Sequence, residues 1–177
     1  MNLTKKTLFW VFVLIMLSGS FYFLDQKAED NQRINEASLK LLPFSVDDIT
    51  EFWINDKREG RTIKLVRGSD GWRLSQPLAV KGDDDAIERL LINIVKTRKD
   101  AILFTQPDPE KLQELGLASP DLKMGISAEG EDVTILFGTK GPTHNVAYVM
   151  FKGRPEVYRV HSDVKKEATQ SVYALRD

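Results

Sequence analysis

The stretch "GDDDAIERLLINIVKTRK", residues 82–99, decides the fold class because the spacing of apolar residues changes there. Apolar residues at i, i+3, i+4, i+7 and i+8 form the stripe of an amphipathic α-helix, here Ile87, Leu90, Leu91, Ile94 and Val95. The segments on either side alternate apolar and polar residues with a period of two, as β-strands do. A helix set among short strands joined by turns predicts an α+β fold with a mostly antiparallel sheet and about three helices.

Three aspartates at the start of this helix, Asp83, Asp84 and Asp85, raise the question of a metal site. Carboxylate clusters bind calcium or magnesium, but a calcium loop spaces its ligands at alternate positions and adds a glycine and a final glutamate. Those features are missing. One aspartate can instead cap the helix while the others meet the positive end of its dipole. We therefore expect a helix cap here and no metal.

Three short antiparallel strands are predicted before the helix, beginning at Ile49 and continuing through residues 62–66 and 71–74. The first strand carries large apolar side chains on both faces, because Trp53 alternates with Phe52 and Ile54. Either the domain covers both faces of this strand, or one face contacts another protein.

The second half of the domain is predicted to be mostly β again. Residues 101–105 form either a strand or an extended tail, and "PDPEKLQELGL", residues 107–117, is a short helix capped by Asp108 and ended by Gly116. The remaining elements are strands within residues 122–126, 133–137, 146–152 and 157–160, the loop "GTKGPTHN" at 138–145, and a last helix from Ser162 or Asp163 through about Ala174. In the strand that contains Tyr148, both faces are again apolar.

The segment "LFWVFVLIMLSGSFYFL", residues 8–24, contains no charge and would reach about 26 Å as a helix, close to the hydrocarbon thickness of a bilayer. It predicts an N-terminal transmembrane helix anchored in the lipid bilayer by its apolar and aromatic residues: Leu8, Trp10, Phe12, Leu14, Leu17, Phe21, Tyr22 and Leu24. The expected organisation is a cytoplasmic stub and anchor at 1–24, a polar stalk at 25–40 and one α+β domain at 41–177.

The charges around this segment predict its orientation. Lys5 and Lys6 precede it and Asp25 follows it, so the N-terminus is expected in the cytoplasm and the domain outside the bacterial inner membrane, in the periplasm or its equivalent. Residues 18–20 are small and would also serve as a signal-peptidase site, so cleavage is an alternative. The aromatic residues 21–23 favour a retained anchor, because aromatic side chains suit the membrane interface.

Composition excludes several classes of function. Two of the 25 basic residues precede the apolar segment, so the rest of the chain carries 23 basic against 26 acidic residues, a net charge of −3. No basic stripe indicates nucleic acid as a partner. The chain has no cysteine, which excludes disulfides, thiol chemistry and cysteine-ligated zinc.

No catalytic motif is found. The two histidines, His144 and His161, have no G-x-S-x-G nucleophile motif to accompany them, and the loop around Lys140 joins two strands, whereas a phosphate-binding P-loop opens a helix. We therefore expect no enzyme activity and no cofactor. The candidate interaction residues are Trp53, Lys140, His144 and Tyr148.

Several segments together resemble the DUF4340 family: "GWRLSQPLAVKGDDDAIERLL" (71–91), "LQELGLASPDLKMGI" (112–126), "AYVMFKGRPEVYRV" (147–160) and the closing "ALRD" (174–177). The resemblance implies a single N-terminal membrane segment and a genomic neighbourhood of ABC-transporter permease and ATPase components. It implies no catalytic residues, because the family's biochemical role is unsettled.

The expected function is therefore a membrane-anchored extracytoplasmic binding module, an accessory subunit of an ABC-type transport complex whose partners are the permease or other envelope proteins. Two alternatives stay open. A large apolar pocket would favour an independent ligand-binding envelope protein. A histidine within hydrogen-bond reach of a serine or carboxylate would be needed for an envelope hydrolase.

Overall fold

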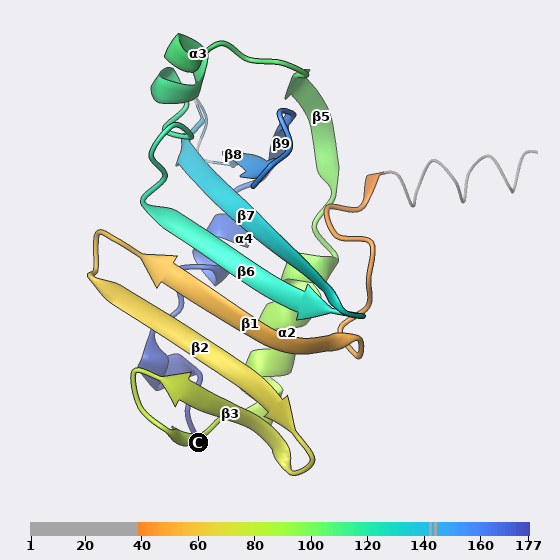
Figure 1. The fold of residues 1–177 in the computed structure, drawn as a ribbon, viewed down its shortest axis with the longest axis vertical. Helices are drawn as coiled ribbons and strands as arrows, with labels where there is room; N and C mark the ends of the chain where they lie inside the picture. Colours follow the sequence, from red (N-terminus) through yellow and green to blue (C-terminus); the bar gives the residue numbers. More distant parts are fainter. Residues whose placement is uncertain (1–38, 142, 144) are drawn as a thin grey trace, which may run out of the picture. The chain divides into compact units, whose positions relative to one another are not determined.

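One nine-stranded sheet dominates the computed structural model, which describes residues 39–141, 143 and 145–177 (Figure 1). Its strand order is β4-β3-β2-β1-β6-β7-β8-β9-β5, and all the described neighbours pair antiparallel. The strands are β1 Ile49–Asp56, β2 Arg61–Gly68, β3 Gly71–Gln76, β4 Val80–Lys81, β5 Lys99–Phe104, β6 Leu122–Ala128, β7 Glu131–Lys140, β8 Val146–Phe151 and β9 Val157–His161.

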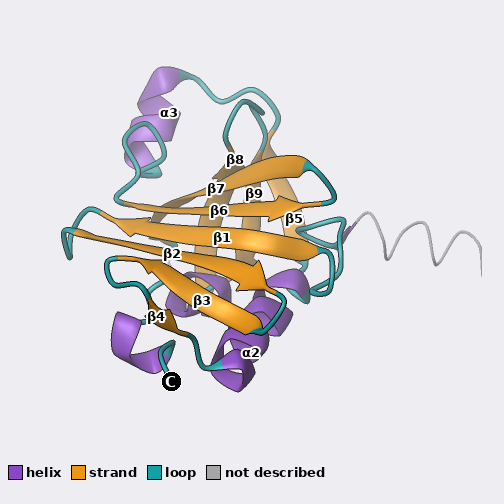
Figure 2. Ribbon diagram, turned by 60° about the horizontal axis from the view of Figure 1, so that its bottom comes forward, coloured by secondary structure: helices purple, strands orange, loops and turns teal. Residues whose placement is uncertain are grey.

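Short helices lie on one face and at one end of this sheet (Figures 1 and 2). They are α2 Asp84–Val95, α3 Pro109–Glu114 and α4 Asp163–Glu167, followed by a 3-10 turn at Val172–Ala174. The two views show α2 and α4 together on one face, and α3 at the end of the sheet near β7 and β8 (Figures 1 and 2). Because α2 and α4 also contact each other, they close the main core against the sheet.

The helix predicted from the apolar stripe is confirmed as α2. Four of its stripe residues, Ile87, Leu90, Leu91 and Ile94, are at most 2% exposed, and Val95 packs partly buried against the same core. They meet the inward residues of the sheet, including Phe52 and Trp72, whose rings contact edge to face at 5.5 Å. Burying each such side chain stabilises the fold by about 1.5–3 kcal/mol before entropy is counted.

The expected cap of α2 is also confirmed. Asp83 Oδ1 accepts a hydrogen bond from Ala86 N at 3.0 Å, which satisfies one free N–H of the first turn. Asp84 Oδ1 accepts one from Trp72 N at 2.6 Å, so the aspartate run also ties α2 to β3. Among the residues that the structure describes, no group of three or more acidic or histidine side chains could hold a metal ion.

The largest differences from the expected elements concern β4, the end of β7 and the last helix. The two-residue strand β4 was not predicted, β7 continues through Gly138 and Thr139 where a loop was expected, and the last helix ends at Glu167 instead of near Ala174. The strand at residues 101–105, left open against an extended tail, is β5. β4 is a short edge strand that pairs with the neighbouring β3, and the isolated bridge of Gly82 with Arg176 follows it.

The predicted fold class was wrong as stated, because it began with a transmembrane helix. Among the described residues, no helix is both long enough and apolar enough to cross a membrane. What the structure shows is a mostly antiparallel sheet with three short helices. The segment 8–24, with its expected anchor residues from Leu8 to Leu24, lies outside the described residues.

Trp53 lies on the outward face of β1, where the sequence left open whether the domain itself covers this side chain. Trp53 is half-buried, and its indole lies over Gly125 of the neighbouring strand β6, its direct cross-strand partner. A Cβ on Gly125 would come within 2.2 Å of the indole Nε1 and Cε2 atoms, so only glycine fits beneath this ring. Trp53 therefore packs against its own sheet on the face opposite Phe52 and Ile54.

Candidate functional site

A polar cleft opens where the β1–β2 turn, the start of β6, the end of β7 and α4 meet. Its outer part has a volume of about 480 Å³ and is lined by Arg58, Thr139, Ser162, Asp163, Lys165, Lys166 and Thr169. A smaller inner part of about 100 Å³ shares four of these residues and continues inward to Asp56, Asp121, Leu122 and Phe137. We call the two parts together the α4 cleft. Its inner part is lined by the apolar side chains of Leu122 and Phe137 together with the carboxylates of Asp56 and Asp121, and its rim carries both cations and carboxylates.

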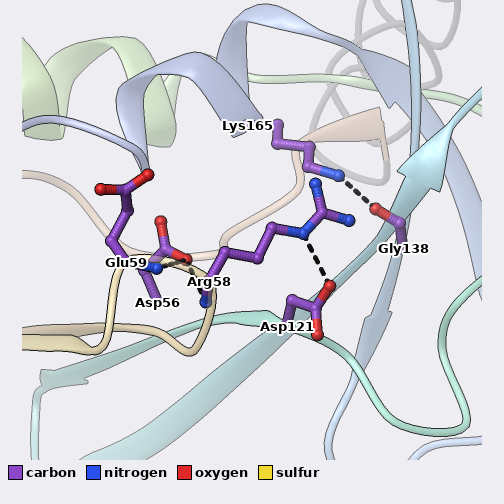
Figure 3. A network of polar contacts seen from close by, with 6 residues as sticks. All are labelled: Asp56, Arg58, Glu59, Asp121, Gly138 and Lys165. Atoms are coloured by element: carbon purple, nitrogen blue, oxygen red, sulfur yellow. Dashed lines mark hydrogen bonds and ion pairs between the residues drawn. The ribbon is translucent and has the colours of Figure 1, made fainter.

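Arg58 is held at the rim of the cleft by Asp121. Arg58 Nε donates to Asp121 Oδ2 at 2.7 Å, which links the β1–β2 turn to the residue preceding β6 (Figure 3). This hydrogen bond and the attraction of the Asp121 charge raise the pKa of Arg58 above its ordinary value. The side chains remain 68% and 46% exposed, so the pair fixes the position of a cation that still faces solvent.

Beneath this pair lies Asp56, whose residue is 6% exposed. Its Oδ1 accepts hydrogen bonds from the backbone N–H groups of Arg58 at 3.0 Å and Glu59 at 3.4 Å, which shapes the β1–β2 turn (Figure 3). Arg61 Nη2 lies 3.6 Å from Asp56 Oδ2 and donates to the carbonyl of Thr169 at 2.6 Å. The hydrogen bond from Arg61 to Thr169 therefore joins the hairpin to the segment that follows α4.

The opposite wall is built on close backbone packing. Lys165 Nζ donates to the carbonyl of Gly138 in β7 (Figure 3). Next to it, the carbonyl of Leu115 accepts from Thr139 N at 2.7 Å, and a Cβ on Gly138 would lie 2.3 Å from that carbonyl oxygen. Gly116, with φ of +69°, ends α3 at this point. This wall of the cleft thus requires glycine at positions 116 and 138.

A protein-family profile described as a domain of unknown function (DUF4340) matches residues 72–177, which is more than half of the chain. The chain belongs to the DUF4340 family. The predicted resemblance is confirmed over this range. No curated protein and no solved structure matches the chain. The profile begins in β3, so Asp56 and Arg58 precede the matched part of the DUF4340 domain, whereas Asp121 and Lys165 lie within it.

A histidine–aspartate pair lies beside the cleft in this DUF4340 domain. His161 Nδ1 is 3.0 Å from Asp163 Oδ2, which meets the distance that a hydrolase would require. The same Nδ1 lies 3.4 Å from Asp163 N, so the neutral ring can accept there while the protonated ring donates to the carboxylate. The side chains are 56% and 73% exposed, and no described residue is hydrogen-bonded to Nε2. Within the part of the chain that the structure describes, no serine or threonine hydroxyl is hydrogen-bonded to this pair, so no nucleophile is aligned with it.

Two of the four predicted interaction residues, Trp53 and Tyr148, lie away from the cleft. Trp53 lies on the outward face of β1, and Tyr148 of β8 packs against a small second core around Leu115, Leu117 and Val157. Lys140 is the last residue of β7, and His144 lies outside the described residues.

The residues that do form the site were missed by sequence reasoning. Arg58 and Asp121 are 63 positions apart, and Arg61 and Thr169 are 108 apart. No local spacing connects them. The available signal was limited to the charged turn "NDKREGR", residues 55–61, which reads as an ordinary hairpin connection.

Proposed function

We propose that this DUF4340 domain is a binding module that acts outside the cytoplasm as an accessory subunit of an ABC-type transport complex, with the α4 cleft as its contact site. The observation that carries this proposal is the preset arrangement of Arg58 and Lys165 on opposite walls of one cleft. Each has its partner in the domain, so neither has to be ordered when a ligand arrives.

The shape of the cleft supports binding of a segment or small ligand. Its outer volume of about 480 Å³ falls within the range of about 300–1,000 Å³ that is usual for ligand sites. The inner part offers apolar contact through Leu122 and Phe137, and the rim offers charged and hydroxyl groups. A partner that inserts an apolar side chain flanked by acidic or polar groups fits these walls.

The proposed location outside the cytoplasm and the proposed transport partner are argued from the sequence. The apolar segment 8–24 is preceded by two lysines and followed by Asp25, which supports export of the domain. The implied neighbourhood of ABC permease and ATPase components supports a transport complex as the partner. An independent ligand-binding envelope protein is the alternative that the cleft volume favours, and the His161–Asp163 pair is the observation that favours a hydrolase.

The proposal is tested by photo-crosslinking of the full chain in cells. A photoreactive amino acid at Thr169, an exposed residue that lines the cleft, should give an adduct with a permease subunit of an ABC transporter. The same group at Lys152, an exposed residue that does not line the cleft, is the control and should give none.

The adduct should also depend on the charge at the rim. Arg58→Gln should weaken it severalfold, because the variant keeps a polar side chain and loses the cation. A Thr169 adduct that contains no transport component would refute the partner, and an adduct obtained equally from Lys152 would refute the site.

A further inference from the structure

We infer that the edge strand β5 pairs antiparallel with β5 of a second copy of this chain. β5 lies at one end of the nine-stranded sheet, and among the described residues β9 is the one strand that pairs with it (Figure 1). An edge strand presents backbone N–H and C=O groups that another strand can pair with. This inference does not depend on the function proposed for the α4 cleft.

The opposite edge of the sheet is covered by the chain itself. The edge strand there, β4, has two residues, and the segment at 176–177 lies beside it. Gly82 forms a bridge with Arg176, and Asp177 N donates to the Lys81 carbonyl at 3.2 Å. Of the two edges, β5 is therefore the longer one and the one that the described residues leave more open.

An apolar side chain lies exposed in the middle of β5. Cover by the segment that precedes β1 reaches only the start of the strand, where Leu41 N donates to the Thr97 carbonyl at 2.9 Å. Further along, Ile102 is 57% exposed, the most exposed aliphatic side chain among the described residues. Native edge strands are commonly protected by charged residues or proline, and the middle of β5, residues 101–103, contains neither.

The charge pattern around β5 favours a second copy as the occupant of this edge. The segment "KTRKD", residues 96–100, has three cations and one carboxylate, whereas "QPDPEKLQE", residues 106–114, has three carboxylates and one cation. In an antiparallel pair with its two-fold axis at Ile102, the basic segment of each copy lies beside the acidic segment of the other, and the two Ile102 side chains meet. A parallel pair would place like charges together.

The pairing is expected to be short. Register shifts between Lys99 and Ala101 and between Ile102 and Phe104 distort β5 where it meets β9. Such bulges limit how far an edge strand can continue a sheet. The contact should therefore centre on residues 101–103, and a single short strand pair should give a reversible dimer instead of a permanent one.

Disulfide crosslinking of the full chain in an uncharged detergent tests this inference, because the chain contains no cysteine. Ile102→Cys places two thiols across the proposed axis. Directly opposed residues of antiparallel strands have Cα atoms about 4.5–5.5 Å apart, within the range of about 4.4–6.8 Å that a disulfide requires. Mild oxidation should therefore yield a disulfide-linked dimer. Leu78→Cys, at a 49% exposed position between β3 and β4, is the matched control and should crosslink at least fivefold less.

Charge reversal tests the orientation of the two copies. Lys96→Glu should reduce the Ile102→Cys crosslink severalfold, because it places carboxylates beside the acidic segment of the other copy. Adding Glu110→Lys should restore the crosslink. All these positions are exposed, so thermal melting should show native stability. Equal crosslinking of the two cysteine variants, or none at Ile102→Cys, would overturn the inference, and a Lys96→Glu change without effect would overturn the antiparallel arrangement.

Discussion

At the scale of single residues, the Asp56–Arg61 and Asp121–Arg58 pairs beside the α4 cleft differ in burial. Removing the aspartate of each pair should therefore lower the free energy of unfolding by different amounts. Asp56→Ala should lower the free energy of unfolding by about 3–5 kcal/mol, because it leaves Arg61 without its buried partner and frees two turn N–H groups. Asp121→Ala removes the exposed partner of Arg58 and should cost at most about 1 kcal/mol. Urea unfolding followed by tryptophan fluorescence measures both. Equal costs would mean that Asp56 is not buried as described.

A second residue-scale prediction concerns Gly125 and Trp53. Gly125→Ala places a methyl group where the indole lies, and the resulting shift should cost about 1–3 kcal/mol of stability. In a Trp53→Ala background the same change should be nearly neutral, so a double-mutant cycle should give a coupling of at least about 1 kcal/mol. Additive effects would contradict the packing of this ring on glycine.

At the scale of elements, α2 provides the clearest test. Leu91→Asp places a charge at a position that is 0% exposed and should unfold the domain, because the cost of several kcal/mol approaches the total stability of a typical domain. Arg89→Asp introduces the same residue on the exposed face of the same helix and should keep the native fold. Circular dichroism and thermal melting distinguish the two. A folded Leu91→Asp variant would show that the stripe is not part of the core.

The elements that could be predicted are those defined by their own residues. The stripe of α2, the cap at Asp83 and the Asp108 and Gly116 signals of α3 are all local, and all are confirmed. The end of β7 could not be predicted, because Gly138 and Thr139 look like loop residues until the Leu115 carbonyl from the α3–β6 loop pairs with Thr139 N. The early end of α4 is likewise invisible in the sequence, since Arg61 of the β2 strand contacts the Thr169 carbonyl there.

At the scale of the whole molecule, the α4 cleft depends on segments from both ends of the domain. The β1–β2 turn supplies Asp56 and Arg58, and α4 supplies Lys165, with β6 and β7 between them. Such an assembly has no sequence signature, because each contact connects residues from distant parts of the chain. The sequence therefore predicted the type of sheet and helices that frame the cleft, but not the residues that line it; its candidate interaction residues Trp53 and Tyr148 lie elsewhere on the sheet.

The last prediction distinguishes the α4 cleft from the His161–Asp163 pair as the functional site. His161→Ala should be tolerated in whatever phenotype a deletion shows, because the imidazole is exposed and its only described side-chain partner is the exposed Asp163. Arg58→Gln combined with Lys165→Met should be damaging, because these substitutions remove the fixed cations from both walls of the α4 cleft. Complementation of a deletion strain measures both, with immunoblotting to confirm equal protein levels.

The opposite complementation result would replace the proposed binding function with a hydrolase function. If His161→Ala and Asp163→Asn each abolished complementation while the double cleft variant remained active, the histidine–aspartate pair would be acting on a substrate, and a hydrolase would replace the binding module. Because His161 and Asp163 lie on the surface, their loss should not unfold the domain, and a defect could then be attributed to chemistry. The two sets of variants therefore separate binding at the cleft from catalysis beside it.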